Sequence, residues 1–195
     1  MTGLTPSQTV GPFFKYGLTP GGEYTWNDAF TNDLVTADAA GERIRIEGRV
    51  FDGDGKTIPD AMLEIWQADA QGRYSDPKDS RALPNSSFRG FGRCGTTKEG
   101  EFSFHTVKPG PVPGPNGTTQ APHILLAVYA RGMTRQVQSR IYFAGEAANA
   151  SDPILALVPA DRRDTLIATP DPAKPGVYRF DVHLQGDQET VFFDV

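Results

Sequence analysis

The spacing of glycine and proline is the feature that most limits what this chain can fold into. Its 195 residues include 21 glycines and 16 prolines, and both residues interrupt helices. The stretches between them are short and rich in β-branched and aromatic residues, which is typical of strands. Strands at short spacing with almost no helix predict an all-β fold, a β-sandwich or a barrel. No internal repeat is visible.

Several segments have the length and pattern of strands. Residues 61–67 are an example, because Leu63, Ile65 and Gln67 fall on one side of an extended chain. Alternation of this kind predicts a strand with one face in the core. The expected strands cover residues 44–51, 61–67, 101–107, 123–130, 136–143, 177–185 and 190–193.

The segments between the strands are expected to be long loops, with one short helix. Residues 160–167 are the only credible helix, opened by Pro159 and closed before Pro170. Residues 68–93 are expected to form a long polar excursion. The stretch 108–117 is so rich in proline and glycine that its composition argues against both a helix and a regular ladder.

The chain is expected to begin with an extended arm, residues 1–40, followed by one domain, residues 41–195. The arm combines turn-forming residues with many aromatic ones, which need a surface to cover them. Two alternatives stay open for that surface, the chain's own sheet and a partner subunit. The aromatic residues of the arm are Phe13, Phe14, Tyr16, Tyr24, Trp26 and Phe30.

Charge and cysteine content exclude several classes of function. The formal net charge of −5 and the pI near 5.2 argue against nucleic acid or an anionic membrane as a partner, since both require a basic face. No apolar run approaches the length of a membrane span, and the first residues lack a signal pattern, so a cytoplasmic location is expected. The single Cys94 excludes an internal disulfide and a cysteine-rich metal site, and is expected to be a buried filler.

The histidines and a group of arginines are the candidate functional side chains. His105 and His183 are expected to be partly exposed strand residues, and His123 a hydrogen-bonded structural histidine rather than a ligand. Arg131, Arg135 and Arg140 surround the turn after Ala130. They are either solvated charges or a clamp for a carboxylate, which suits the planar guanidinium fork.

Several motifs together carry a resemblance to one family. They are Gly48-Arg49-Val50-Phe51-Asp52, Glu64-Ile65-Trp66-Gln67 with Gly72-Arg73-Tyr74, Val107-Lys108-Pro109-Gly110-Pro111, Ala121-Pro122-His123 and Arg140-Ile141-Tyr142-Phe143. In this order they resemble the intradiol ring-cleavage dioxygenases, over roughly residues 41–193. The resemblance implies a mixed β-sandwich core of the intradiol dioxygenase type, with long loops.

The resemblance also implies an iron site that this chain lacks. Catalytic members hold one ferric ion with two tyrosines and two histidines, hard and borderline donors that suit this cation. The four corresponding positions hold Tyr74, Val112, His123 and Leu125. A basic residue three before the first histidine is typical of the family, and here it is Gln120. With two of four ligands absent, no metal and no catalytic residue are expected in this chain.

Some members of the family are built from two related chains, of which only one keeps the iron ligands. The resemblance implies that this chain is the iron-free one, and that its partner is a homologous beta chain carrying Fe(III) in a larger assembly. A carboxylated catechol and O2 would then meet at the interface, where Thr9, Gly11, Pro12 and Arg131 would wall the substrate pocket. The rival hypotheses are a stand-alone intradiol dioxygenase and a non-enzymatic binding or carrier domain.

Overall fold

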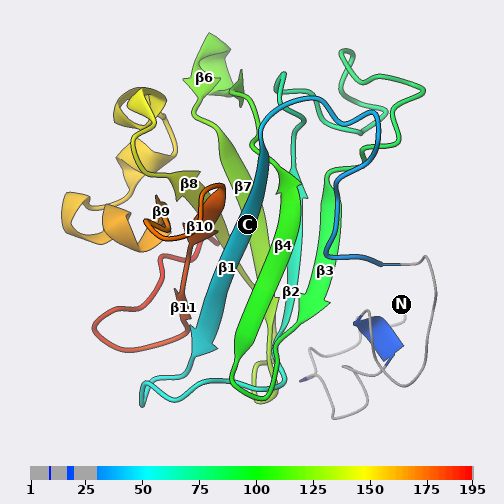
Figure 1. Cartoon of the computed structure of the whole chain (residues 1–195). Coiled ribbons are helices and arrows are strands. Elements are labelled where there is room, and N and C mark those ends of the chain that lie inside the picture. The colour runs from blue at the N-terminus through cyan, green and yellow to red at the C-terminus, as the bar shows by residue number, and fades with distance from the viewer. Residues whose placement is uncertain (1–8, 10–16, 20–29, 195) are drawn as a thin grey trace, which may run out of the picture.

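A mixed β-sheet curled into two facing layers forms the centre of the molecule (Figure 1). The computed structural model describes residues 9, 17–19 and 30–194, and the all-β prediction is confirmed within this part. Along the sheet the order is β3-β2-β7-β8-β9-β10-β1-β4, with β11 pairing beyond β10 on the same edge of β1. Its strands are β1 (Arg43–Phe51), β2 (Met62–Gln67), β3 (Phe91–Gly95), β4 (Glu101–Val107), β7 (His123–Tyr129), β8 (Val137–Phe143), β9 (Ile167–Pro170), β10 (Val177–Arg179) and β11 (Val182–His183).

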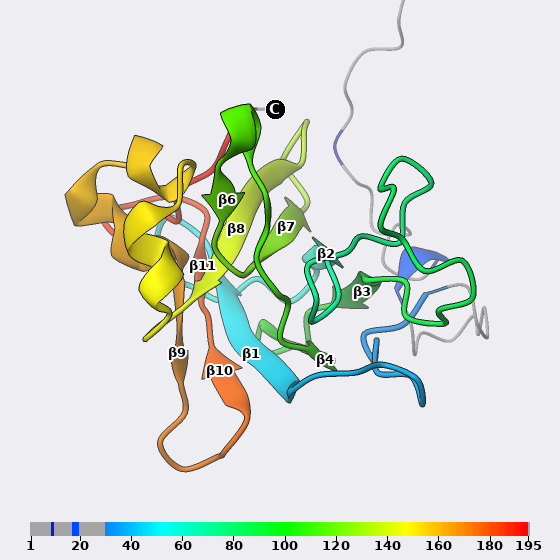
Figure 2. The same cartoon turned by 90° about the horizontal axis from the view of Figure 1, so that it is seen from above.

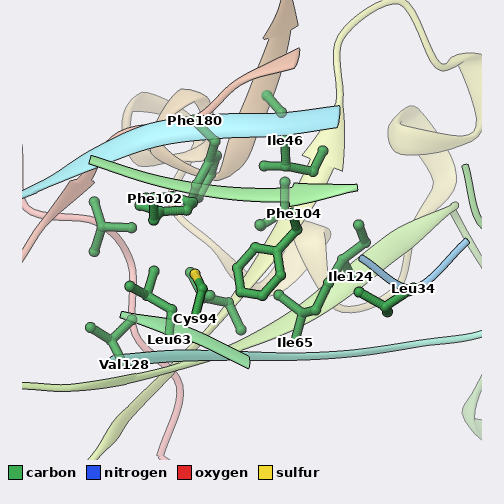
Figure 3. Packing of buried hydrophobic residues seen from close by; sticks show 14 of the residues in the cluster. Leu34, Ile46, Leu63, Ile65, Cys94, Phe102, Phe104, Ile124, Val128 and Phe180 are labelled. Carbon is green, nitrogen blue, oxygen red and sulfur yellow. The ribbon is translucent and has the colours of Figure 1, made fainter. Parts of the chain in front are cut away.

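The core lies between the layer of β1 and β4 and the layer of β2, β3 and β7. Figure 3 shows Ile46 and Phe104 from the first layer facing Ile65 from the second. Gln67 is also buried, and its amide donates to the carbonyl oxygen of Val107 at 2.9 Å, so this polar group joins the layers without being left unpaired. The alternation along residues 61–67 therefore identified the core face correctly.

Cys94 fills space in this core, as the sequence predicted (Figure 3). Burial raises the pKa of its thiol to about 12. A thiol with such a pKa stays protonated at neutral pH and is a poor nucleophile or metal ligand.

The end of the arm closes the gap between β3 and β4, the two ends of the sheet. The amide of Arg93 in β3 donates to Thr31 O at 2.9 Å, and the amide of His105 in β4 donates to Asn32 O at 2.8 Å. Leu34 then enters the core with only 5% of its surface exposed. Figure 1 shows this segment (blue) running beside β3 and then across to the start of β1. We call residues 31–34 the seam segment.

Strand β3 begins inside the stretch 68–93 that was expected to be a polar excursion, so that prediction was wrong for residues 91–93. Glycines at 92 and 95 interrupt the alternation that would have revealed the strand. Gly92 is required by packing, because a Cβ built there would lie 2.5 Å from Cδ1 of Leu34. The seam segment thus occupies the space that a side chain at this position would take.

The expected strand over residues 177–185 is broken into β10 and β11. At the break Phe180 turns into the core, and the carboxylate of Asp181 accepts the amide of Arg49 at 2.8 Å, which replaces a ladder bond. The expected strand 190–193 is not formed. Among the described residues, its strand pairing is limited to an isolated bridge between Phe193 and Gln138. The unexpected β9 follows directly on the helix of residues 160–166.

The proline-rich stretch contains more regular structure than its composition suggested. Strand β5 (Val112–Pro113) pairs with β6 (Thr119–Gln120), and a single turn, η1 (Pro115–Gly117), lies between them. Pro113 is tolerated because the ladder is two residues long and pairs on one side only within the described chain. The short helices η2 (Ala147–Ser151), η3 (Leu155–Leu157) and η4 (Ala160–Leu166) are of the 3-10 type; seen from above, they lie on the opposite side of the strands from the β2–β3 loop (Figure 2).

Candidate functional site

The four positions that correspond to iron ligands in the resembling family lie around the outer face of β7 and β8. Leu125 is the cross-strand partner of Trp66 in β2, and the Trp66 ring stacks on that of Tyr74 at 6.0 Å between centroids. Val112 pairs with Gln120 across the β5–β6 ladder, just before His123 begins β7. The fold therefore brings these sequence-distant positions together.

Close backbone contact joins the loop that carries Tyr74 to the loop that carries Val112. Gly72 has φ +74°, and a Cβ on it would lie 1.9 Å from the carbonyl oxygen of Pro111. The amide of Gly110 also donates to Asp69 O at 2.9 Å. No residue other than glycine fits at position 72 without moving one of the loops. The glycines of both motifs thus hold the two positions in register.

Tyr74 is in a poor environment for a phenolate. It is part-buried, and burial raises the pKa of its phenol, while the charge of Arg140 acts in the opposite direction. The phenol of Tyr74 is therefore protonated at neutral pH in this chain.

His123 is a buried, hydrogen-bonded histidine, and the hydrogen bond is the part of the prediction that the structure confirms. Its side chain is buried, and Nδ1 donates to the carbonyl oxygen of Ala121 at 2.7 Å. Burial lowers the pKa of the imidazole to about 4. The ring is therefore neutral at physiological pH.

The lowered pKa predicts a loss of stability in mild acid. The folded-state pKa of about 4 lies below the ordinary value of 6.5, so between these values the unfolded chain binds more protons. The contribution of His123 to the free energy of unfolding is fully present above pH 6.5 and declines as pH falls toward 4, by up to about 1.4 kcal/mol per unit. Urea unfolding at pH 7, 6 and 5 measures it. In a His123→Gln variant this part of the slope should vanish, and an unchanged slope would contradict the assignment.

Arg140 is the charged side chain at the centre of this region, and the sequence placed it elsewhere, with Arg131 and Arg135. It is the cross-strand partner of Leu125, and Nη1 donates to Oε1 of Gln120 at 2.6 Å. A longer contact of 3.4 Å joins Nη1 to the hydroxyl of Tyr142. The basic residue that the family carries near position 120 is absent, but a guanidinium from the neighbouring strand reaches the same place.

The residues present at the four positions do not fit a ferric ion. Val112 and Leu125 offer only hydrocarbon, Tyr74 favours the protonated phenol, and a permanent positive charge on Arg140 lies among them. Within the described ranges no three His, Cys, Asp or Glu side chains gather in a way that could hold a metal ion. No catalytic step through iron in this chain follows from this donor set.

Asp152 holds the same region in place through hydrogen bonds, and the sequence did not identify this residue as important. Its carboxylate is fully buried and accepts hydrogen bonds from the amide of Ala121 at 2.7 Å and the hydroxyl of Tyr142 at 3.1 Å. It also accepts the amides of Ile154 and Leu155 at the start of η3. No motif marked this aspartate, but its Asp-Pro sequence is a turn signal.

Arg131 and Thr9, two of the residues expected to wall a substrate pocket, lie next to each other. The amide of Gly132 donates to the hydroxyl of Thr9 at 2.7 Å. Arg131 is 70% exposed, and its Nε contacts Oδ2 of Asp60 at 3.0 Å. Gly11 and Pro12, the other two, lie outside the described residues.

Arg93 lies under the root of the arm. Its guanidinium is paired with Glu64, lies 3.7 Å from the centroid of the Phe30 ring, and donates to Leu18 O at 3.3 Å. The described root of the arm thus packs on this chain's own sheet. The packing of residues 1–8, 10–16 and 20–29, where most of the arm's aromatic residues lie, is outside the described part.

A hollow of about 770 Å³ lies on the other layer, over β1 and β4. None of the four ligand positions lines it, and neither Arg131 nor Arg140 does. Its charged side chains are paired with each other, as in Arg49–Glu101 at 2.6 Å and Arg179–Glu47 at 2.9 Å. Mutually neutralised charges give this hollow no preference for a charged ligand, and we assign it no role.

Comparison with known proteins agrees with the family resemblance that the order of the motifs indicated. A family model described as Dioxygenase matches residues 19–186. A protocatechuate 3,4-dioxygenase alpha chain from Burkholderia cepacia is 48% identical, over 98% of this chain and 97% of its own length. A protocatechuate 3,4-dioxygenase beta chain from the same organism is 34% identical, over 84% of this chain and 73% of its own.

Solved structures agree on the fold. The dioxygenase domain of a dioxygenase–carbohydrate-binding protein fusion from Streptomyces sp. SirexAA-E is 25% identical, with a TM-score of 0.63, over 93% of this chain and 99% of that one. Among the residues that the structure describes, none of the helices has the length and apolar character of a membrane span.

Proposed function

The chain belongs to the intradiol ring-cleavage dioxygenase family, and we propose that it serves there as the alpha chain of a protocatechuate 3,4-dioxygenase. The observation that carries this proposal is the pattern of identity. Agreement with an alpha chain is 48% over nearly the whole length, against 34% over a shorter part for a beta chain of the same organism. The hydrocarbon side chains of Val112 and Leu125 at two ligand positions support the same conclusion.

In this proposal the partner is a homologous beta chain that holds the Fe(III). The assembled enzyme adds O2 to protocatechuate, 3,4-dihydroxybenzoate, and cleaves the ring between the hydroxylated carbons to give 3-carboxy-cis,cis-muconate. Both oxygen atoms of O2 enter the product, so no further reductant is needed. The acidic charge of −5 fits a cytoplasmic assembly without a nucleic-acid or membrane partner.

This chain would contribute shape and charge to the substrate pocket. Arg131 uses Nε for Asp60 and is 70% exposed, so its two terminal nitrogens remain for the substrate carboxylate. A bidentate guanidinium–carboxylate pair fixes both position and orientation. Thr9, bonded to Gly132, would place the arm, with Gly11 and Pro12, along the same wall.

Counting iron in the separate and combined chains tests the proposal. The chain is expressed alone, the beta chain alone, and the two together, and each preparation is examined for iron content and for the visible absorption of iron–phenolate. We expect no such band from this chain alone and one iron per alpha–beta pair in the complex. A stoichiometric band from this chain alone, or ring cleavage of catechol by it, would contradict the proposal in favour of a stand-alone enzyme.

A further inference from the structure

Contacts connect each of the four positions of the lost iron site to Arg140, directly for Leu125 and through intermediate residues for the others. Leu125 is its direct cross-strand partner on β7. Trp66, the next partner along the sheet from Leu125, carries the stacked ring of Tyr74. Both contacts are on the outer face, because the residues that alternate with Leu125 and Arg140 are buried in the other direction.

The other two positions reach Arg140 through hydrogen bonds. Gln120 receives Nη1 at 2.6 Å and is the ladder partner of Val112. Tyr142 lies 3.4 Å from Nη1, is the cross-strand partner of His123, and has its ring 5.7 Å from the imidazole. Val112 and His123 are thus each separated from the guanidinium by one residue, and Tyr74 by the two residues Trp66 and Leu125, although the charge of Arg140 still acts on its phenol.

The guanidinium is held in place rather than loose on the surface. Gln120 is itself fixed, because its Nε2 donates to Pro113 O at 2.9 Å. Tyr142 is fixed from behind by Asp152 at 3.1 Å. Arg140 is part-buried, and among the described residues no carboxylate forms an ion pair with it. Its positive charge therefore acts on the surrounding positions with little neutralisation.

We propose that Arg140 occupies the place that the metal ion takes in iron-binding relatives, so that this chain would exclude iron even with its two missing ligands restored. The inference rests on the proposed function and goes beyond it: loss of ligands removes affinity, whereas a fixed cation at the centre repels a second one. Arginine keeps its charge at any physiological pH, so the exclusion does not depend on solution conditions.

The test restores the donors with and without Arg140. The full chain carrying Val112→Tyr and Leu125→His is co-expressed with the beta chain, and the same pair is combined with Arg140→Gln or Arg140→Met. A matched control combines the pair with Arg135→Gln, which removes an exposed arginine of the same hairpin. Iron per alpha–beta pair and iron–phenolate absorption are measured after purification in ferrous sulfate and air.

We expect one iron per alpha–beta pair with the restored ligands alone and with the Arg135 control, and close to two when Arg140 is also replaced. A count near two while Arg140 is present would overturn it. So would a count of one with both neutral replacements in an intact assembly, because another group would then exclude the metal. Failure of both replacements to assemble would overturn it as well, since Arg140 would then be required for packing.

The iron count of the unmodified complex distinguishes a failure of this inference from a failure of the proposed function. One iron per pair in that complex is what the proposed function requires, and any other count contradicts the function whatever the variants do. The same variants of the full chain alone, incubated with ferrous sulfate in air, repeat the comparison without the partner. In the chain alone, the expected iron content is near zero per chain when Arg140 is present and near one per chain when it is replaced.

Discussion

Replacing Arg131 with alanine in the assembled enzyme is expected to raise KM for protocatechuate roughly 10- to 150-fold, with a smaller change in kcat. A charge-assisted hydrogen bond contributes on the order of 1.5–3 kcal/mol, which corresponds to this range. The structure supports such a role because Asp60 holds only Nε, at 3.0 Å, while the side chain is 70% exposed. The loss should fall on KM because the carboxylate is bound away from the ring carbons that react.

Two controls make this prediction specific. Arg135→Ala removes an exposed arginine from the same turn and should leave KM for protocatechuate unchanged. Catechol, which lacks the carboxylate, should be turned over equally by the Arg131→Ala enzyme and its parent. Steady-state kinetics with both substrates decide the matter. Equal KM values for protocatechuate in the parent and the Arg131→Ala enzyme would remove Arg131 from the pocket.

The largest expected effect on stability is that of Asp152→Ala, on the order of 3–5 kcal/mol. The carboxylate is fully buried and accepts three backbone amides, those of Ala121, Ile154 and Leu155, besides the hydroxyl of Tyr142. Alanine would leave all of these donors without a partner, and each buried unpaired donor costs about 1–3 kcal/mol. Burial of the whole group prevents water from replacing the lost acceptor.

Urea unfolding of the parent and the variant measures this effect, as a shift of the midpoint at constant slope. Tyr142→Phe is the matched control, because it removes one hydrogen bond to the same carboxylate and should cost only about 0.5–1.5 kcal/mol. A midpoint for Asp152→Ala equal to that of Tyr142→Phe would show that the backbone amides do not depend on the carboxylate.

The parts of the fold that the sequence predicted are those where alternation is regular. Residues 61–67 and 101–107 have uninterrupted alternation, and both form strands with the expected buried faces. Strand β3 was missed because Gly92 makes room for Leu34, a residue almost 60 positions earlier in the chain. The break at Phe180 depends in the same way on a distant strand. Long-range packing, absent from any local pattern, decided these elements.

In the candidate site, too, some residues were predicted from local motifs and others became visible only through long-range packing. The motifs located Tyr74, Val112, His123 and Leu125, and the structure brings them together. Arg140 was grouped with Arg131 by nearness in sequence, although a hairpin with its tip at Gly132 and Met133 places Arg140 opposite Leu125. The register of the hairpin was the available signal. Arg131, in contrast, is paired with Asp60, which lies in a separate loop. No spacing in the sequence indicates this ion pair.

The seam segment makes the end of the N-terminal region a structural part of the sheet. Residues 31–34 hydrogen-bond to both β3 and β4, so they cover two strand edges that would otherwise offer unpaired amides and carbonyls. Exposed edges of this kind act as templates for intermolecular pairing and aggregation. Truncation that reaches Leu34 would therefore damage solubility and folding directly, and its consequences could not be attributed to a lost subunit contact. Experiments that trim the arm to study assembly must stop before residue 30.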